Sequence, residues 1–373
     1  MRFHVINLPH TQTTKEFLPC AYTQKVVNFC RMMKSLGHIV YLYGSEQNEA
    51  PCDEFITCIT KDEQKSNNWK KEFFAIEWNP NVSYWKIMND NTIIEIGRRI
   101  ERTDFICIIG GNCQKPISDA FPNHSSVEYG IGYEGVYSKY RVFESYAWMH
   151  YVYGLTKQMN GNYYDTVIPN YFDPADFPLG DKKQDYFLFI GRMISRKGAH
   201  IAAQVCKELG VKLILAGQGV REQKDGKIVA DDMIIEGDVE HVGVVGVKER
   251  GELMSKARAV FVPTQYIGPF EGVHAEAMMC GTPVITTDWG VFSETVYDGL
   301  NGFRTRTMGE MIEAAKLCDK LNYKEIRDYA IGRFSLNVVR HQYDTYFQRL
   351  LQLWGDGWYS KDSLNMEQRC LRS

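Results

Sequence analysis

One stretch of the chain constrains its fold more than any other: residues 270–287 read as a loop, a short helix and a buried strand in direct succession. Gly272 opens the helix, Gly281 ends it, and Val284–Thr287 has the β-branched composition of an interior strand. The first turn of such a helix leaves N–H groups free to hold an anion. Glu276 lies one turn past Gly272 on the same face, where its carboxylate can bind ribose hydroxyls. The alternative is an ordinary helix-to-strand corner with a solvated Glu276.

Length, charge and cysteine usage narrow the class of protein. A chain of 373 residues is too long for one typical core and suits two domains. The net charge of −3 gives no reason to expect nucleic-acid binding. The ten cysteines form no Cys-x-x-Cys pair, and several lie in apolar runs, so we expect reduced core thiols and a cytoplasmic protein. The first residues resemble a strand rather than a signal peptide, and no segment is apolar enough to span a bilayer.

The order of apolar patterns predicts an α/β fold. In the first half, strands are expected at 3–8, 39–43, 105–109 and 126–131, with a helix at 21–36. Turn chemistry at 167–174 marks a domain boundary. A second series follows, with strands at 186–190, 212–216 and 259–262, a helix at 199–209, and a last helix at 337–354. Such alternation implies parallel doubly wound sheets that bind ligands at the carboxyl ends of their strands. We therefore expect an N-terminal domain at 1–168, a C-terminal domain at 169–336, and a final helix and tail at 337–373.

Two motifs carry a resemblance to a known family. The run E-A-M-M-C-G-T-P-V-I-T-T-D at residues 276–288 closely resembles the donor-site signature of family-4 glycosyltransferases, which are retaining enzymes with the GT-B fold. That family also implies a Gly-Arg…Lys-Gly element, which stands here at 191–198. The resemblance implies two Rossmann-like domains that face a cleft, with the last helix crossing back to the first domain. It further implies a UDP- or GDP-linked nucleotide sugar as co-substrate and no other cofactor.

The predicted donor site combines loop cations with the opening motif. Arg192 and Lys197 follow a strand whose carboxyl end should face the cleft, where they can neutralise a diphosphate and stabilise it as it leaves. Exposed cations of an ordinary loop are the alternative. The segment 240–246 resembles the base-binding loop of the family. We assign catalytic roles to Arg192, Lys197 and Glu271, and donor contacts to Gly191, Gly217, Val244, Pro269, Phe270, Gly272, Val273 and Glu276. No Asp-x-Asp motif stands in a donor loop, so no essential metal is expected.

One position departs from the family pattern. The family places a second glutamate eight residues before the one at Glu276, and this chain has Gly268 there. The missing carboxylate normally holds a hydroxyl of the donor sugar. Glu271, where relatives often have glycine, either supplies a substitute carboxylate from a shifted loop or is simply exposed. The departure leaves the donor-sugar preference open.

The N-terminal domain is expected to hold the acceptor. His10 follows the first strand, and Glu128, Tyr133 and Glu134 follow or end a later one, so we assign these four to the acceptor side. The acceptor is a glycan, a lipid-linked sugar or a small molecule. The segment 68–78 interleaves bulky aromatics with lysines, which suits either packing against the sheet or peripheral contact with a membrane surface.

The sequence thus favours a retaining glycosyltransferase that moves a sugar from a nucleotide donor to an acceptor hydroxyl. Two alternatives remain at this stage. One is a different reaction on the same fold, such as nucleotide-sugar epimerisation. The other is a non-catalytic nucleotide-sugar-binding protein or partner subunit, which the glycine at 268 motivates.

Overall fold

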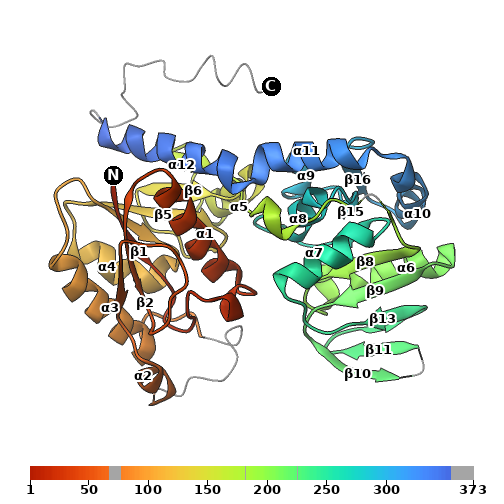
Figure 1. Ribbon diagram of the computed structural model, residues 1–373, viewed down its shortest axis with the longest axis horizontal. Helices are drawn as coiled ribbons and strands as arrows, with labels where there is room; N and C mark the ends of the chain where they lie inside the picture. Colours follow the sequence, from red (N-terminus) through yellow and green to blue (C-terminus); the bar gives the residue numbers. More distant parts are fainter. Residues whose placement is uncertain (67–76, 181, 225, 354–373) are drawn as a thin grey trace.

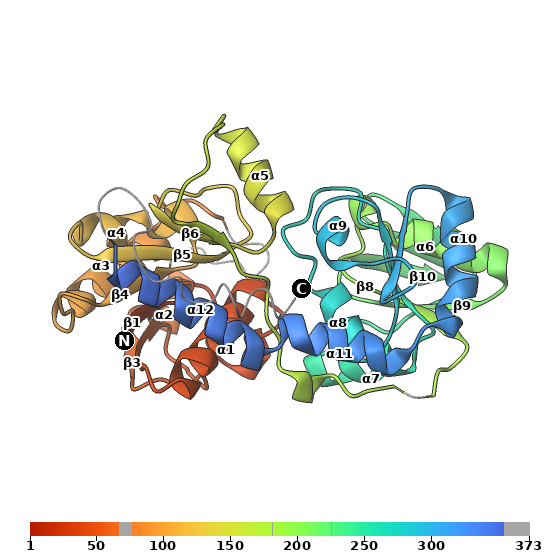
Figure 2. The same ribbon diagram turned by 90° about the horizontal axis from the view of Figure 1, so that it is seen from above.

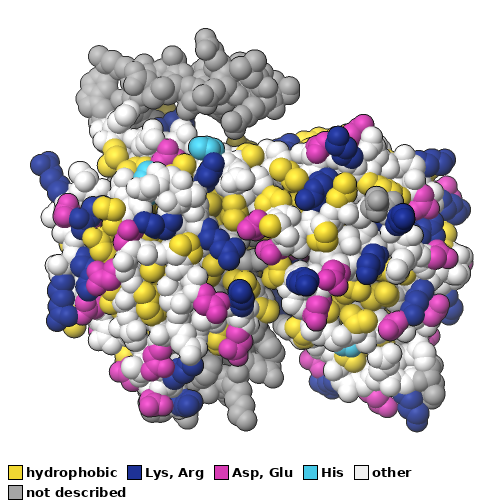
Figure 3. Space-filling view, in the orientation of Figure 1, with side chains coloured by type: hydrophobic (Ala, Val, Ile, Leu, Met, Phe, Trp, Pro, Cys, Tyr) yellow, Lys and Arg dark blue, Asp and Glu magenta, His cyan; other side chains and the backbone are white. Residues whose placement is uncertain are grey.

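The computed structural model describes residues 1–66, 77–180, 182–224 and 226–353, which form two α/β domains side by side (Figure 1). Each domain is built on a parallel sheet with helices on its faces. The predicted fold class of two Rossmann-like domains is confirmed. Acidic and basic side chains are interspersed over the face that Figure 3 shows, as the small net charge leads one to expect.

The N-terminal sheet has the strand order β3-β2-β1-β4-β5-β6-β7, and its neighbouring strands are parallel. Its strands are β1 (Arg2–Ile6), β2 (Ile39–Gly44), β3 (Glu54–Thr57), β4 (Phe105–Ile108), β5 (Ser125–Ile131), β6 (Tyr140–Phe143) and β7 (Asp165–Val167). The helices are α1 (Ala21–Ser35), α2 (Lys61–Ser66), α3 (Ser83–Gly97), α4 (Lys115–Ala120) and α5 (Tyr146–Leu155). The chain order reverses between β1 and β4, which is where a doubly wound sheet opens a crevice for ligands.

The C-terminal sheet has the order β13-β9-β8-β14-β15-β16, again with parallel neighbours. Its strands are β8 (Tyr186–Ile190), β9 (Lys212–Ala216), β13 (Val239–His241), β14 (Val260–Val262), β15 (Val284–Thr287) and β16 (Gly302–Thr305). A small antiparallel sheet of β10 (Val220–Lys224), β11 (Lys227–Ala230) and β12 (Ile234–Glu236) is inserted after β9. The helices are α6 (Ala199–Leu209), α7 (Val247–Lys256), α8 (Val273–Met279), α9 (Phe292–Thr295), α10 (Met308–Leu317) and α11 (Tyr323–Phe334).

The last described helix, α12 (Leu336–Leu351), returns to the first domain. Figures 1 and 2 show α11 and α12 running along one side of the molecule across both domains. Phe347 of α12 packs edge-on against Phe3 and Phe105 of the N-terminal sheet, with ring centres 4.7 and 4.9 Å away. The apolar core of the first domain is therefore completed by the end of the described chain.

The chain passes between the domains at two neighbouring places. Tyr171 belongs to the N-terminal core, whereas Phe172 packs in the C-terminal core. The backbone N–H of Phe172 donates to Phe334, and that of Leu336 donates back to Phe172 (2.9 and 3.0 Å). These two hydrogen bonds tie together the segment that leaves the N-terminal domain and the segment that returns to it. Within the described residues, no helix is long and apolar enough to cross a membrane.

Candidate active site

A cavity of about 390 Å³ lies between the domains and takes in both walls of the cleft. Most of the predicted catalytic and donor residues line it: Gly191, Arg192, Lys197, Gly217, Val244, Pro269, Phe270, Glu271, Gly272 and Val273. They come from the loops that follow β8, β9, β13 and β14, all at the carboxyl ends of parallel strands. The structure thus brings together residues that are far apart in the sequence.

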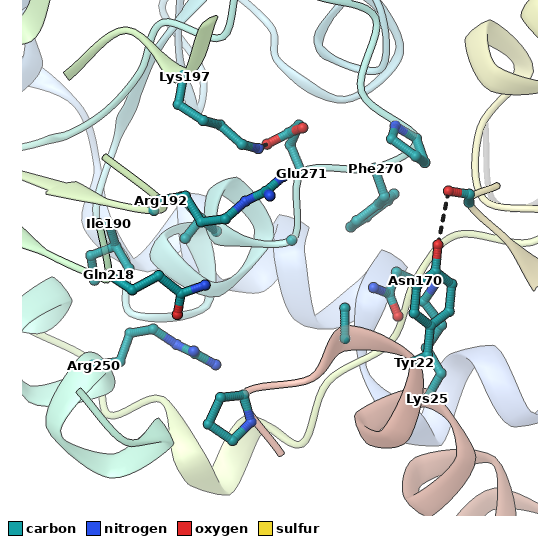
Figure 4. Close-up of a pocket in the computed structure, with 18 of the residues that line it drawn as sticks. Tyr22, Lys25, Asn170, Ile190, Arg192, Lys197, Gln218, Arg250, Phe270 and Glu271 are labelled. Carbon is teal, nitrogen blue, oxygen red and sulfur yellow. Dashed lines mark hydrogen bonds and ion pairs between the residues drawn. The ribbon is translucent and has the colours of Figure 1, made fainter. Parts of the chain in front are cut away.

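The C-terminal wall of the cavity carries three of its cationic side chains. Figure 4 shows Arg192, Lys197 and Arg250 on this side, facing Tyr22, Lys25 and Asn170 across the cavity. The Arg192 side chain is exposed and, in the part of the chain that the structure describes, forms no ion pair. Its guanidinium is therefore free to bind an anion in the cleft.

Glu276 does not line the cavity and instead contacts a residue that does. Its side chain is buried, and Arg250 of α7 donates a hydrogen bond of 2.7 Å to its Oε1. Burial raises the pKa of Glu276 above its usual value, while Arg250 opposes that change. Arg250 lines the cavity, so the Glu276 carboxylate holds this guanidinium against the cavity wall.

Glu271 occupies the place where a side chain at position 268 would point. Its carboxylate pairs with Lys197 and accepts a hydrogen bond of 2.9 Å from the Tyr266 hydroxyl. A Cβ atom added to Gly268 would lie 2.7 Å from Cγ and 2.8 Å from Cδ of Glu271. Glutamates at both positions would therefore collide, and the glycine makes room for the carboxylate from three residues later.

His274 holds the backbone that turns Glu271 inward. Glu271 has a φ of 59°, a left-handed conformation that costs a non-glycine residue on the order of 1 kcal/mol. The backbone N–H of His274 lies 3.1 Å from the Glu271 carbonyl oxygen, and its ring Nδ1 lies 2.7 Å from the same atom. Burial lowers the pKa of His274 to about 4, so the ring is neutral near pH 7 and Nδ1–H is the donor.

Burial of Lys197 and its pairing with Glu271 act in opposite directions. Burial lowers the pKa of Lys197, but the Glu271 carboxylate and Tyr266 more than compensate, and the net change is upward. The ammonium is therefore charged at neutral pH. It also lies 5.1 Å from the centre of the Tyr266 ring, so the aromatic face adds to its fixed position.

The predicted base-binding loop lies against the exit of β9. Gly217 donates to the carbonyl of Gly243 at 2.8 Å, and His241 Nε2 lies 2.7 Å from the Gly217 carbonyl oxygen. Val244 lines the cavity and its side chain is 61% exposed. An exposed apolar residue beside two backbone turns is a suitable surface for a planar ring.

The predicted acceptor residues lie outside this cavity. His10 is buried beneath Trp78 and Trp85, and burial lowers its pKa to about 3. Glu128 is fully buried and accepts hydrogen bonds from the Tyr133 hydroxyl (3.1 Å) and from the backbone of residues 137 and 138. Glu134 is exposed and accepts a hydrogen bond from Tyr151. The aromatic segment 68–78 lies largely outside the described residues.

Several cavity residues escaped the sequence analysis: Tyr22, Lys25, Glu144, Asn170, Gln218 and Arg250. One signal for Lys25 was available, because it stands four residues before Phe29 and seven before Met32, on the buried face of the helix. Among the described residues, no group of three or more His, Cys, Asp or Glu side chains could hold a metal ion.

Sequence comparison relates the C-terminal domain to known transferases. Residues 175–327 match the family model described as glycosyl transferases group 1. The chain is 27% identical over 146 residues to an uncharacterized glycosyltransferase of Methanocaldococcus jannaschii, covering 38% of this chain and 40% of that protein. It is 29% identical over 154 residues to a glycogen synthase of Mycobacterium tuberculosis, covering 37% of this chain and 35% of the synthase. The matches thus span about two fifths of the first of these relatives and about a third of the second.

Structural comparison covers nearly the whole chain. A glycosyltransferase involved in avilamycin A biosynthesis superposes with a TM-score of 0.64 at 19% identity, covering 94% of this chain and 98% of that one. The Anabaena protein HepE, solved in complex with UDP and glucose, gives a TM-score of 0.61 at 15% identity, covering 95% and 100%. At these identities the likeness shows the fold. The chain therefore has the GT-B fold of glycosyltransferases, and its residues 175–327 match the group 1 glycosyl transferases.

Proposed function

We propose that the protein transfers a sugar from a nucleotide-sugar donor to an acceptor hydroxyl, with retention of configuration. The observation that carries this proposal is the C-terminal wall of the cavity, where Arg192, Lys197 and Arg250 surround one space. A diphosphate brings negative charge there, and a further negative charge develops on its terminal phosphate as the nucleotide leaves. The matches of residues 175–327 to transferases, and the UDP and glucose present in the HepE structure, support a sugar nucleotide as the ligand.

The Glu271 carboxylate supports a catalytic protein over a non-catalytic binding protein. The non-catalytic alternative was motivated by the glycine at 268, which removes a carboxylate from the donor loop. Glu271 returns a carboxylate to that place, and Lys197 and Tyr266 hold it there. We propose that it binds a hydroxyl of the donor sugar. The base of the nucleotide is uracil or guanine, and a cytoplasmic setting agrees with the free thiols of the described cysteines.

Nucleotide binding is the direct test of the donor site. UDP, GDP and their sugar conjugates should be screened for thermal stabilisation, since a ligand that binds the folded state raises the melting temperature. Arg192→Ala should abolish the shift given by the best ligand and lower kcat/KM for the donor by about 100-fold.

Arg196→Ala is the matched control. Arg196 lies in the same loop, but its guanidinium stacks on Tyr266 at 4.6 Å and does not line the cavity. The best nucleotide should therefore raise the melting temperature of Arg196→Ala as much as that of the parent protein. If none of the nucleotides stabilises the parent protein, the proposed function is wrong.

A further inference from the structure

The N-terminal wall of the cavity contains a charge pair with no part in the donor site. Lys25 of α1 and Glu144, the residue after β6, lie 2.6 Å apart, and each side chain is 4% exposed. Lys25 also donates to the carbonyl of Gly130 at 2.9 Å and lies 4.8 Å from the centre of the Tyr22 ring. Both residues line the cavity.

A buried charge pair of this kind needs a reason beyond stability. Removing two charges from water is unfavourable, and a pair of apolar side chains of similar volume is often at least as stable. The pair faces a cavity instead of the interior of a core, so a ligand can reach it. Its position favours a role in binding.

Glu144 has hydrogen-bonding capacity left over. Among the residues that the structure describes, Lys25 is its one partner and contacts Oε1, so the carboxylate keeps lone pairs for a further donor. A Cβ on Gly132 would come within 2.8 Å of Oε2, so the glycine keeps the space beside the carboxylate open. A small polar group that enters this space can donate to Glu144.

The structure also fixes Glu144 next to the donor loop. The hydroxyl of the following residue, Ser145, donates to the carbonyl of Pro269 at 2.7 Å. The same Gly132 Cβ position lies 3.2 Å from the Pro269 ring. Glu144 and Glu271 both line the cavity, so two carboxylates from opposite domains face the same space. Burial raises the pKa of Glu144, Lys25 opposes this change, and the charge of Glu271 adds to it.

We propose that Glu144 binds the attacking hydroxyl of the acceptor and that Lys25 is its positioning residue. The inference rests on the proposed function and names the acceptor half of that site. In the transfer, the acceptor oxygen forms a bond to the anomeric carbon as the bond from that carbon to the diphosphate breaks. The hydroxyl proton passes to the leaving diphosphate. Because Lys25 neutralises Glu144, the site suits a neutral hydroxyl compound such as a sugar or polyol, not a cationic acceptor.

The test uses the purified protein with UDP-glucose and GDP-mannose as donors, in water alone and with glycerol added as a hydroxyl probe. Glu144→Gln keeps the shape of the side chain but weakens its acceptor. Because the attacking hydroxyl is then held less firmly, sugar release and glycosyl-glycerol formation should fall by about 100-fold, while the nucleotide still raises the melting temperature.

Two further variants separate binding from structure. The double variant Lys25→Met/Glu144→Leu replaces the charge pair with apolar side chains. Its melting temperature should be close to that of the parent protein, but its turnover should stay low. Asp165→Asn breaks the Arg141–Asp165 pair elsewhere in the same domain. This variant should lower stability but keep the turnover of the parent protein. Equal turnover by the parent and Glu144→Gln would overturn the role of Glu144 but leave the proposed function standing. A parent protein that binds no nucleotide would overturn the proposed function as well.

Discussion

At the scale of single residues, the loop before α8 shows how a side chain can fill the space beside a glycine three residues earlier. Glu271 stands three residues after Gly268, yet its side chain fills the space beside that glycine. The left-handed backbone at Glu271 turns the side chain back, and His274 fixes that turn through the carbonyl. The position of a functional group is set here by one backbone angle.

Exchanging the two residues tests this equivalence. Glu271→Gly alone removes the carboxylate, and we expect kcat/KM for the donor to fall by about 100-fold. Gly268→Glu alone should also be harmful, because its side chain collides with Glu271. The double variant Gly268→Glu/Glu271→Gly should recover most of the activity. A double variant no more active than Glu271→Gly would show that the two positions are not interchangeable; melting temperatures control for misfolding.

Sequence reasoning found the cations that belong to a motif and missed those that lie on helices. Arg192 and Lys197 follow a buried strand, so their place at the sheet edge could be predicted. Lys25 lies on α1 and Arg250 on α7, and both line the cavity that the two domains share. Which face of a helix turns toward a cleft depends on domain packing, which the local pattern does not encode.

At the scale of elements, buried runs were predicted closely and loops were not. The strands at 186–190, 212–216 and 284–287 and the helix at 199–209 have the predicted bounds, because continuous apolar runs and helical spacing are strong local signals. The loop at 132–138 folds around Glu128, whose carboxylate accepts the N–H groups of Tyr137 and Ser138. Residue type alone did not reveal that this carboxylate is fully buried.

Glu128 makes stability depend on pH. Burial raises its pKa to about 7, above the value of about 4.5 expected in the unfolded chain. The stabilisation by the protonated form is complete below pH 4.5 and is lost as the pH rises through 7. Between these limits the parent should lose about 3 kcal/mol relative to Glu128→Gln, which stays neutral. Urea unfolding at pH 5 and pH 7.5 gives the free energy of unfolding of both proteins. If the parent and Glu128→Gln differ by the same amount at both pH values, the raised pKa of Glu128 is contradicted.

At the scale of the whole molecule, the domains also meet across the cleft. Glu294 of α9 accepts hydrogen bonds from the backbone N–H groups of Tyr146 and Ala147 at the start of α5, at 3.0 and 2.6 Å. A carboxylate from one domain thus caps a helix of the other. This contact and the bond from Ser145 to Pro269 hold the cleft in the observed arrangement.

Loss of the cap should favour an open cleft. Glu294→Ala removes a helix cap worth roughly 1 kcal/mol, so the radius of gyration in small-angle scattering should increase. The KM for the donor should rise about fivefold. Glu313→Ala is the control, because its pair with Lys316 is exposed and lies on one helix. An unchanged scattering curve for Glu294→Ala would mean that the cap does not control closure.

The return of α12 to the first domain has a consequence for how the polypeptide emerges from the ribosome. Val339, Tyr343 and Phe347 belong to the same apolar core as Phe3 and Phe29, so that core stays open until residues near 350 have been translated. Residues 172–335 form a contiguous unit that needs no such late segment. We therefore expect the usual vectorial order, in which the N-terminal domain matures first, to be reversed for this chain, with its first domain completed after its last helix is made.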